Sequence, residues 1–328
     1  MVNSIIIGYG SVGKRHHRIL AEKGECFLIE PKKLQGISPT SLLFTSSEEF
    51  LAAAEFRAIS NLNEYLVVLS NWGPDHVSEM RKFLECGFTN FIIEKPIASS
   101  MRELSFIETV LLDSRIIIWS NFHLRFDSGI HKLRKFIAQN NLGQIQLFSV
   151  SGGARCLSTN GIHWLDLFFF LQDVKLETFS AEFLDDALNP RNPSLAFLSG
   201  YLYCRNEDSS RFLMIFTNKS RSNEIIEIFW ERYRAEIIGD KIQVFVSRNS
   251  KSDVITKTED FSDLVFETQI LGDGMNLLYQ EFFKTKESMA NLVKANKILL
   301  AAMNSNFVRR YSEDLRESTE VEKDWRIS

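Results

Sequence analysis

The chain of 328 residues has few of the features that mark secreted, metal-binding or disulfide-stabilised proteins. Its four cysteines (Cys26, Cys86, Cys156 and Cys204) are scattered, and no two of them form a C-x-x-C pair. This spacing indicates neither a disulfide framework nor a zinc site. Isolated cysteines are typical of a reducing compartment, and the amino-terminal residues do not resemble a signal peptide. We therefore expect a cytoplasmic protein without a bound metal.

Long apolar runs and an excess of one charge are also missing. No stretch approaches the ~20 apolar residues that span a bilayer. The 38 basic and 42 acidic side chains give a net charge of −4, which argues against a nucleic-acid partner. We therefore expect neither a membrane nor a nucleic-acid partner. The length favours two domains, since one hydrophobic core seldom organises so many residues.

The most informative segment is near the amino terminus. Three isoleucines at residues 5–7 predict a buried strand and lead directly into a G-x-G-x-x-G segment at residues 8–13. A helical apolar pattern follows, so the segment has the strand–turn–helix setting of a dinucleotide-binding unit. Gly8 allows the tight turn, Gly10 lets the backbone approach a pyrophosphate, and Gly13 allows close helix–strand packing. The predicted cofactor contacts at this turn are Gly8, Gly10, Ser11, Val12, Gly13 and Arg15.

The next predicted strand ends at Glu30, about 20 residues beyond the glycine motif, where a carboxylate can accept hydrogen bonds from ribose hydroxyls. The same charge would repel a 2′-phosphate, so Glu30 favours NAD. Lys32 and Lys33 follow at once and leave NADP open. An ordinary surface glutamate is the alternative interpretation of Glu30.

Strand and helix patterns alternate through residues 1–121, which predicts a doubly wound parallel sheet, that is, a Rossmann domain. In such sheets ligands lie outside the carboxyl ends of the strands. Ser70 and Asn71 follow the apolar strand at residues 66–69, and Glu94 and Lys95 follow the strand at residues 91–93. We predict that these four residues contact the cofactor.

The pattern changes after residue 121. Mostly strand-like segments follow one another without intervening helices, which predicts an antiparallel sheet in a second, α+β domain at residues 122–308. The predicted strands are at residues 144–151, 178–184, 195–204, 211–218, 224–230, 233–238 and 241–246. A charged tail at residues 309–328 completes the chain.

Two residues have the right chemistry and setting for catalysis. Lys95 closes a strand within Glu94-Lys95-Pro96, and its ammonium group can orient a hydroxyl and stabilise a developing alkoxide. The alternative is a surface Glu–Lys pair. His163 lies in a predicted helix, and an imidazole with a pKa near 6.5 can move a proton in either direction at neutral pH. His76, His123 and His131 have no comparable sequence context.

Four motifs in order resemble the glucose–fructose oxidoreductase/inositol dehydrogenase (Gfo/Idh/MocA) family. They are the glycine turn, Glu94–Ala98 (E-K-P-I-A), the Asn121…Arg125-Phe126 segment and Gly161-x-His163-x-x-Asp166-Leu167. The resemblance extends to about residue 304. It implies a Rossmann domain followed by an α/β domain whose open antiparallel sheet forms a homodimer or homotetramer. It also implies nicotinamide-dependent chemistry on sugars or polyols, with Lys95 and His163 matching the catalytic lysine and histidine.

One position departs from the family pattern. Family dehydrogenases commonly place an aspartate four residues before the histidine, where this chain has Thr159. A threonine carries no negative charge, so a Lys–Asp–His proton relay is absent in its usual form. Asn160 lies one helical turn before His163 and could bind neighbouring hydroxyls. We expect Thr159, Asn160, Arg125 and Asp166 to contact the substrate or to orient groups that do.

These observations predict an NAD(P)-dependent oxidoreductase acting on a CH–OH or carbonyl carbon of a sugar, sugar phosphate or nucleotide-linked sugar. The departure at Thr159 keeps a second interpretation open, a non-catalytic dinucleotide sensor on the same fold. The 27 phenylalanines keep a third open, a reductase of a non-sugar substrate such as a tetrapyrrole.

Overall fold

The computed structural model describes residues 2–32, 41–176, 178–184, 189, 197–206, 210–247, 261–285 and 287–311. The chain divides into two compact units with a boundary between Asn121 and Phe122. Residues 278–297 belong to the first unit, and the described residues from Ile298 onward belong to the second. Lys33 and most of the expected tail, residues 312–328, lie outside the described residues.

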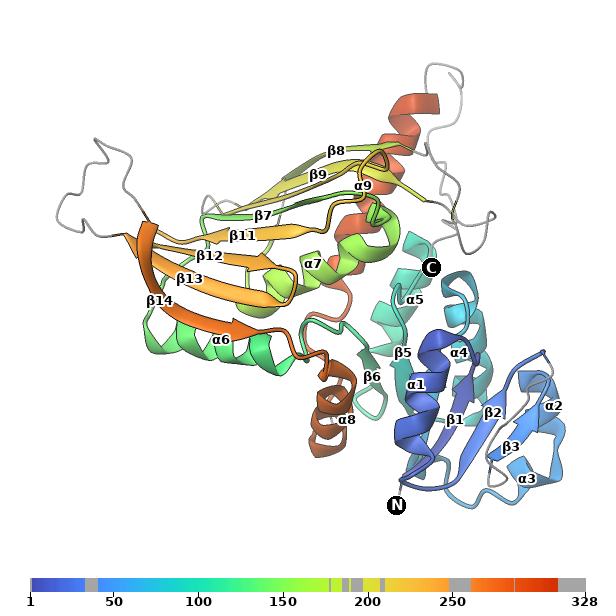
Figure 1. The fold of residues 1–328 in the computed structure, drawn as a ribbon. Coiled ribbons are helices and arrows are strands. Elements are labelled where there is room, and N and C mark those ends of the chain that lie inside the picture. Colours follow the sequence, from blue (N-terminus) through green and yellow to red (C-terminus); the bar gives the residue numbers. More distant parts are fainter. Residues whose placement is uncertain are drawn as a thin grey trace. The chain divides into compact units, whose positions relative to one another are not determined.

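The first unit is built on a six-stranded parallel sheet (Figure 1). Its strands are β1 (Asn3–Ile7), β2 (Cys26–Ile29), β3 (Ser41–Phe44), β4 (Tyr65–Leu69), β5 (Asn90–Ile93) and β6 (Ile117–Ser120), in the spatial order β3-β2-β1-β4-β5-β6. This is the doubly wound order of dinucleotide-binding domains, and it confirms the predicted parallel sheet. The order reverses between β1 and β4, so the glycine turn and Ser70-Asn71 follow adjacent strands. The sequence did not predict β3.

The helices of this unit are α1 (Ser11–Leu20), α2 (Ser47–Ala52), α3 (Ala54–Arg57), α4 (His76–Cys86) and α5 (Met101–Val110). Helix α5 begins with a capping box. Ser100 Oγ accepts a hydrogen bond from Glu103 N, while Glu103 Oε2 accepts one from Ser99 N. Gly87 ends α4 in the left-handed conformation, with a φ of 101°.

The segment at residues 278–297 packs against the edge strand β6. The backbone of Ile118 makes two hydrogen bonds with it, donating to the Ser288 side-chain Oγ at 3.0 Å and accepting from Met289 N at 3.0 Å. The Trp119 indole donates to Glu287 O at 2.8 Å. These partners lie in the first unit, and residues 278–297 belong to it although they fall within the range 122–308 expected for the second domain.

The second unit contains an eight-stranded sheet in the order β14-β13-β12-β11-β7-β10-β9-β8 (Figure 1). The strands are β7 (Leu147–Gly152), β8 (Thr178–Leu184), β9 (Ser199–Arg205), β10 (Arg211–Phe216), β11 (Ile225–Phe229), β12 (Tyr233–Ile238), β13 (Lys241–Ser247) and β14 (Phe261–Gln269). The predicted antiparallel sheet is confirmed in the main. The exception is β7, which pairs with β10 in parallel, and the sequence did not predict β14.

Two helices, α6 (Ser128–Gln139) and α7 (Leu157–Leu171), pack against the sheet, and α7 contacts β9 and β10. Phe168 is fully buried and its ring lies against Phe148 and Phe212, so its side chain belongs to the core. Helices α8 (Gly274–Lys284) and α9 (Lys294–Tyr311) complete the described structure. Among the described residues, no helix has the length and apolar character needed to span a membrane.

Candidate functional site

The glycine turn has the geometry of a phosphate-binding cradle. Gly8 has a φ of 89°, and a Cβ there would lie 2.6 Å from Asn71 N. A Cβ on Gly13 would lie 2.0 Å from Gly8 O, so this position requires glycine. Gly10 differs from both, because a Cβ there would meet no atom within 4 Å. The backbone of Gly10 is therefore open to approach by a ligand, and no side chain caps the first N–H groups of α1.

Ser70 and Asn71, at the end of β4, border the turn. Ser70 Oγ is within hydrogen-bond distance of Ile7 O at 3.0 Å and of Gly8 O at 2.8 Å, so it fixes the turn to the sheet. The buried Oδ1 atom of Asn71 accepts no hydrogen bond from the described residues. A buried acceptor without a donor is costly unless a ligand or water supplies one. The open backbone at Gly10 and this acceptor fit a bound dinucleotide.

Glu30 lies at the turn, as predicted, and its carboxylate contacts the protein backbone. Its Oε2 atom accepts a hydrogen bond of 2.8 Å from Tyr9 N, and its Oε1 atom accepts one of 3.2 Å from Lys32 N. Each oxygen can accept a second bond. The carboxylate is therefore held beside the cradle with acceptor capacity left for ribose hydroxyls. Arg15 is exposed on α1.

The basic run at residues 14–18 differs from the solvated helix face that its composition suggests. Arg15 and Arg18 are exposed, but His16 is fully buried and His17 nearly so. His17 Nδ1 lies 2.9 Å from the Tyr9 hydroxyl, next to the glycine turn. Burial lowers the pKa of His17. The two histidines therefore face inward, where they anchor α1.

Glu94 is the centre of a buried polar cluster. Its Oε1 atom lies 2.8 Å from His16 Nε2 and accepts a 2.8 Å hydrogen bond from Asn121 Nδ2. His16 Nδ1 in turn lies 2.6 Å from the Tyr279 hydroxyl. Burial alone would raise the pKa of Glu94, but the hydrogen bond and charge of His16, the Asn121 amide and the charge of Lys95 together lower it. Glu94 is therefore held as a carboxylate.

Lys95 follows Glu94 at the carboxyl end of β5, and the Lys95–Pro96 peptide bond is cis. His76 fixes this loop to the loop after β4. Its Nδ1 atom lies 2.8 Å from Pro96 O, and its Nε2 atom lies 3.1 Å from Asn71 O. His76 is buried, and burial lowers its pKa. A neutral imidazole has one N–H, so His76 donates to one of these two carbonyls and contacts the other.

His163 lines a cavity of about 240 Å³ within the second unit. The cavity also contains polar side chains from several separate segments, namely His123, Arg155, Asn160 and Glu224. The rings of His123 and His163 lie 4.1 Å apart, centroid to centroid, at 74°. Arg155 Nε forms a 2.7 Å ion pair with Glu224 Oε2. The cavity therefore combines imidazole, cationic and anionic side chains.

The sequence missed three of these cavity residues. His123 was not predicted as a site residue because no motif surrounds it, although it lies close in the sequence to the predicted Asn121 and Arg125. Arg155 and Glu224 are far apart in the chain and meet because Ile225 pairs with Ser151 across β11 and β7. That register was the missing signal, because a single-sequence pattern predicts strands without saying which residues face each other.

The other predicted substrate residues are arranged differently. Asn160 lines the cavity, and its side-chain amide donates to Arg155 O. Thr159 is buried, with its hydroxyl 3.2 Å from Cys156 Sγ. Arg125 and Asp166 form a buried ion pair, with Arg125 Nε 3.0 Å from Asp166 Oδ2. Burial raises the pKa of Asp166, and Arg125 opposes that shift. The pair joins α7 to the segment before α6.

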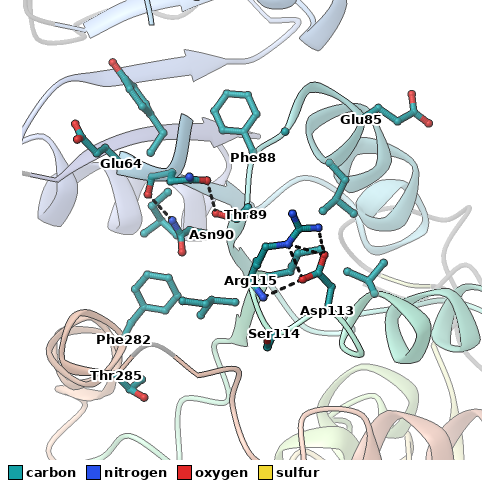
Figure 2. Close-up of a pocket in the computed structure, with 18 of the residues that line it drawn as sticks. Glu64, Glu85, Phe88, Thr89, Asn90, Asp113, Ser114, Arg115, Phe282 and Thr285 are labelled. Carbon is teal, nitrogen blue, oxygen red and sulfur yellow. Dashed lines mark hydrogen bonds and ion pairs between the residues drawn. The ribbon is translucent and has the colours of Figure 1, made fainter. Parts of the chain in front are cut away.

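A wide cavity of about 1070 Å³ lies elsewhere in the first unit (Figure 2). It is at the amino ends of β4, β5 and β6 and contains none of the predicted site residues. Several of its polar groups are paired with one another. Arg115 bonds to Asp113, and the Thr89 hydroxyl lies 3.0 Å from Asn63 Oδ1 (Figure 2). Ligands of open parallel sheets lie at the opposite, carboxyl ends, so we place the candidate site there.

Solved structures with this fold include several dehydrogenases. A levoglucosan dehydrogenase, in complex with NADH and levoglucosan, matches with a TM-score of 0.70 and 14% identity over 94% of this chain and 97% of that one. A UDP-N-acetylglucosamine 3-dehydrogenase from Acidithiobacillus ferrooxidans matches with a TM-score of 0.62 and 15% identity over 94% and 98%. A dehydrogenase from Chromobacterium violaceum matches with a TM-score of 0.71 and 11% identity over 96% and 98%.

No protein-family model matches the sequence, and no curated protein matches it. The similarity to dehydrogenases is therefore one of fold. It covers both units of the chain, from the parallel sheet to the eight-stranded sheet.

Proposed function

We propose that this protein is a nicotinamide-dinucleotide-dependent oxidoreductase that acts on a CH–OH or carbonyl carbon of a sugar-type substrate. The observation that carries the proposal is the glycine turn. Its backbone is open at Gly10, and the buried Oδ1 atom of Asn71 beside it has no hydrogen-bond donor among the described residues. Lys95 follows the neighbouring strand β5. The levoglucosan dehydrogenase of the same fold, solved with NADH, supports the cofactor class.

The residues of the turn bind and orient the dinucleotide in this proposal. The N–H groups of Ser11 and Val12 receive the pyrophosphate charge, aided by the positive end of the α1 dipole. Glu30 accepts hydrogen bonds from ribose hydroxyls and disfavours a 2′-phosphate, so we propose NAD as the preferred cofactor. The bound cofactor supplies or accepts the hydride.

Lys95 and His163 supply the polar chemistry. Lys95 donates a hydrogen bond to the reacting oxygen and stabilises negative charge that develops on it. His163 moves the proton, and general acid–base help of this kind contributes about 10²–10⁴-fold to rate. Asn160, together with the Arg155–Glu224 pair, offers donors and acceptors for neighbouring hydroxyls. Several sugar hydroxyls could be bound by this mixture of groups.

The position of Thr159 supports a second candidate, a dinucleotide sensor without turnover. Its hydroxyl faces Cys156 and carries no charge to assist His163 or Lys95. The two candidates share the dinucleotide site and differ in turnover.

Steady-state assays with NAD⁺, NADP⁺ and a panel of monosaccharides, sugar phosphates and nucleotide sugars test the proposal. We expect turnover with NAD⁺, and a loss of at least 100-fold in kcat in Lys95→Ala and in His163→Ala. Lys23→Ala, at an exposed lysine beyond α1, is the matched control and should retain full activity. NADH binding without turnover across the panel would favour the sensor. Activity within a few-fold of the parent in both site variants would contradict the proposed roles.

A further inference from the structure

The cavity in the second unit contains two histidines whose rings are in contact. The ring centroids of His123 and His163 lie 4.1 Å apart, and the ring planes meet at 74°. With this geometry the edge of one imidazole lies against the face of the other. Both side chains line the same cavity of about 240 Å³. The candidate proton carrier, His163, therefore has a second imidazole as an immediate neighbour.

The two histidines differ in their access to solvent. His163 lies within α7 and is only 6% exposed, whereas His123 lies in the turn before α6 and is exposed. The fully buried Phe122 ring also lies near His163, 6.4 Å away from centroid to centroid. Histidine binds and releases protons near neutral pH, which is why it serves as a proton shuttle. An exposed imidazole in contact with a buried one is therefore placed to pass protons between it and water.

The backbone that carries His123 is fixed by its surroundings. Arg125 N donates a 2.9 Å hydrogen bond to Phe122 O, which closes a turn around His123. A Cβ on Gly274 would lie 2.5 Å from His123 O, so the first residue of α8 packs directly against this carbonyl. The ring contact with His163 therefore starts from an ordered turn.

The charged side chains near the two rings form ion pairs. Arg155 and Glu224 line the same cavity and pair with each other at 2.7 Å. The buried pair of Arg125 and Asp166 joins the turn of His123 to α7. Because each of these cations has an anion beside it, the two pairs add little net charge to the surroundings of the imidazoles.

Two further polar side chains of these segments have partners of their own. The carboxylate of Asp127, which precedes α6, accepts three hydrogen bonds from backbone N–H groups. The hydroxyl of Thr159, one helical turn before His163, lies 3.2 Å from the Cys156 thiol. The Asp127 carboxylate is thus engaged with the backbone, and Thr159 carries no charge.

Two imidazoles in contact do not titrate independently. A positive charge on one ring disfavours a positive charge on the other, so the second proton binds more weakly than the first. The pair therefore titrates in two steps that belong to both rings together. Between these steps the pair holds a single proton.

We propose that His123 and His163 act as one proton-sharing pair, in which the exposed His123 carries protons between the buried His163 and solvent. Oxidation of a CH–OH carbon passes a hydride to the dinucleotide and releases the hydroxyl proton, so one proton leaves the site in each turnover, and reduction takes one up. His123 acts on the reaction only through His163 and is a positioning residue. This use of the pair rests on the proposed function, whereas the sharing of the proton rests on the ring contact.

The titration of the two rings tests the pair without using activity. NMR of protein with isotope-labelled histidine follows each ring as the pH changes. Removal of the ring that binds the first proton should raise the midpoint of the ring that binds the second by about one pH unit or more. His123→Gln and His163→Gln together cover both orders of binding, and His123→Gln changes an exposed side chain of a turn.

The matched control is His131→Gln. The His131 ring lies against Phe170 and does not line the cavity, so this variant should leave the midpoints of His123 and His163 unchanged. If the remaining ring has its parent midpoint in both His123→Gln and His163→Gln, the proposal is overturned.

The buffer dependence of turnover tests the transfer to solvent. His123→Ala removes the exposed ring, so in dilute buffer kcat should fall by about tenfold or more. Added imidazole should restore most of this loss, because it exchanges the proton with His163 in place of His123. A structural role would not depend on the buffer. A parent-like kcat in dilute buffer, or a loss that imidazole does not restore, would overturn this use of the pair.

The two measurements separate this inference from the proposed function. If the parent shows no turnover but the midpoints of the two rings are coupled, the proposed function fails and the proton-sharing pair stands. If the parent turns over, His163→Gln loses activity and the midpoints are not coupled, the pair fails and the proposed function stands.

Discussion

Two glycines of the same turn, Gly10 and Gly13, separate the effects of folding and of binding. A methyl group on Gly13 would meet the backbone oxygen of Gly8 at 2.0 Å, which cannot be relieved by a side-chain rotation. The same group on Gly10 would enter open space, and the Gly10 φ of −69° suits alanine. The two glycine-to-alanine substitutions therefore add the same methyl group, but only the one at Gly13 clashes with the protein.

We expect Gly10→Ala to keep the thermal stability of the parent and to lose at least tenfold in NADH affinity, because its methyl group occupies the cradle. Gly13→Ala should lose both affinity and about 1–3 kcal/mol of stability through overpacking. Thermal unfolding and NADH fluorescence titration measure the two effects. Parent-like NADH binding by Gly10→Ala would mean that the dinucleotide does not lie at this turn.

Glu30 sets the expected choice between the two nicotinamide cofactors. Its carboxylate is fixed by the N–H groups of Tyr9 and Lys32, so its charge stays next to the cradle. Glu30→Ala should therefore improve the binding of NADPH relative to NADH by about tenfold, or ~1.4 kcal/mol. Isothermal titration with both cofactors measures the ratio. Glu22→Ala, at an exposed carboxylate beyond α1, should leave the ratio unchanged. An unaltered ratio in Glu30→Ala contradicts this role.

At the scale of single elements, α5 shows how a local signal determines a helix start. Ser100 is buried, and its hydroxyl accepts from Glu103 N. Ser100→Ala removes that acceptor and should cost about 1 kcal/mol of stability, within a usual range of about 0.5–2. Ser105→Ala, at an exposed position inside the same helix, should be neutral or slightly stabilising, since alanine has the higher helix propensity. Denaturant unfolding of both variants measures the difference, and equal stabilities would contradict the capping role.

Elements with strong local patterns were predictable, and those that depend on distant partners were not. The apolar runs of β4 and β5 and the capping box of α5 are visible in the sequence alone. Strand β3 was missed because it lies at the edge of the sheet, where Leu42 and Leu43 are exposed and the pattern is weak. Helix α7 begins at Leu157, directly after Cys156, which has a positive φ of 57°. No propensity marks such a start.

The candidate site follows the same rule. Lys95 and the glycine turn were predictable because each follows its own strand within a few residues. The cluster of His16, Glu94 and Tyr279 was not, because its members are brought together by tertiary packing of α1, β5 and α8. Neither His16 nor Tyr279 was among the predicted site residues.

At the scale of the whole molecule, three exposed isoleucines and Ser151 form a row across four adjacent strands of the eight-stranded sheet. Strand pairing places Ile215 opposite Ser151, Ser151 opposite Ile225, and Ile225 opposite Ile238, on adjacent strands. The three isoleucines are 49%, 41% and 51% exposed. The residues next to each isoleucine along its strand are buried. Successive side chains of a strand point to opposite faces, so the isoleucines lie on the face that points away from the core.

Exposed apolar side chains gathered on one face, as these three isoleucines are with Ser151 between two of them, mark an association surface more often than isolated ones do. We therefore expect the chain to form a homodimer or homotetramer through this face of the sheet. Ile225→Glu places a charge in the centre of the row and should shift the mass measured by light scattering to that of a single chain. Leu112→Glu introduces the same charge at an isolated leucine that is 84% exposed in the first unit, and should leave the mass unchanged. A parent protein that is monomeric at micromolar concentration, or an Ile225→Glu protein with the parent's mass, would contradict association through this face.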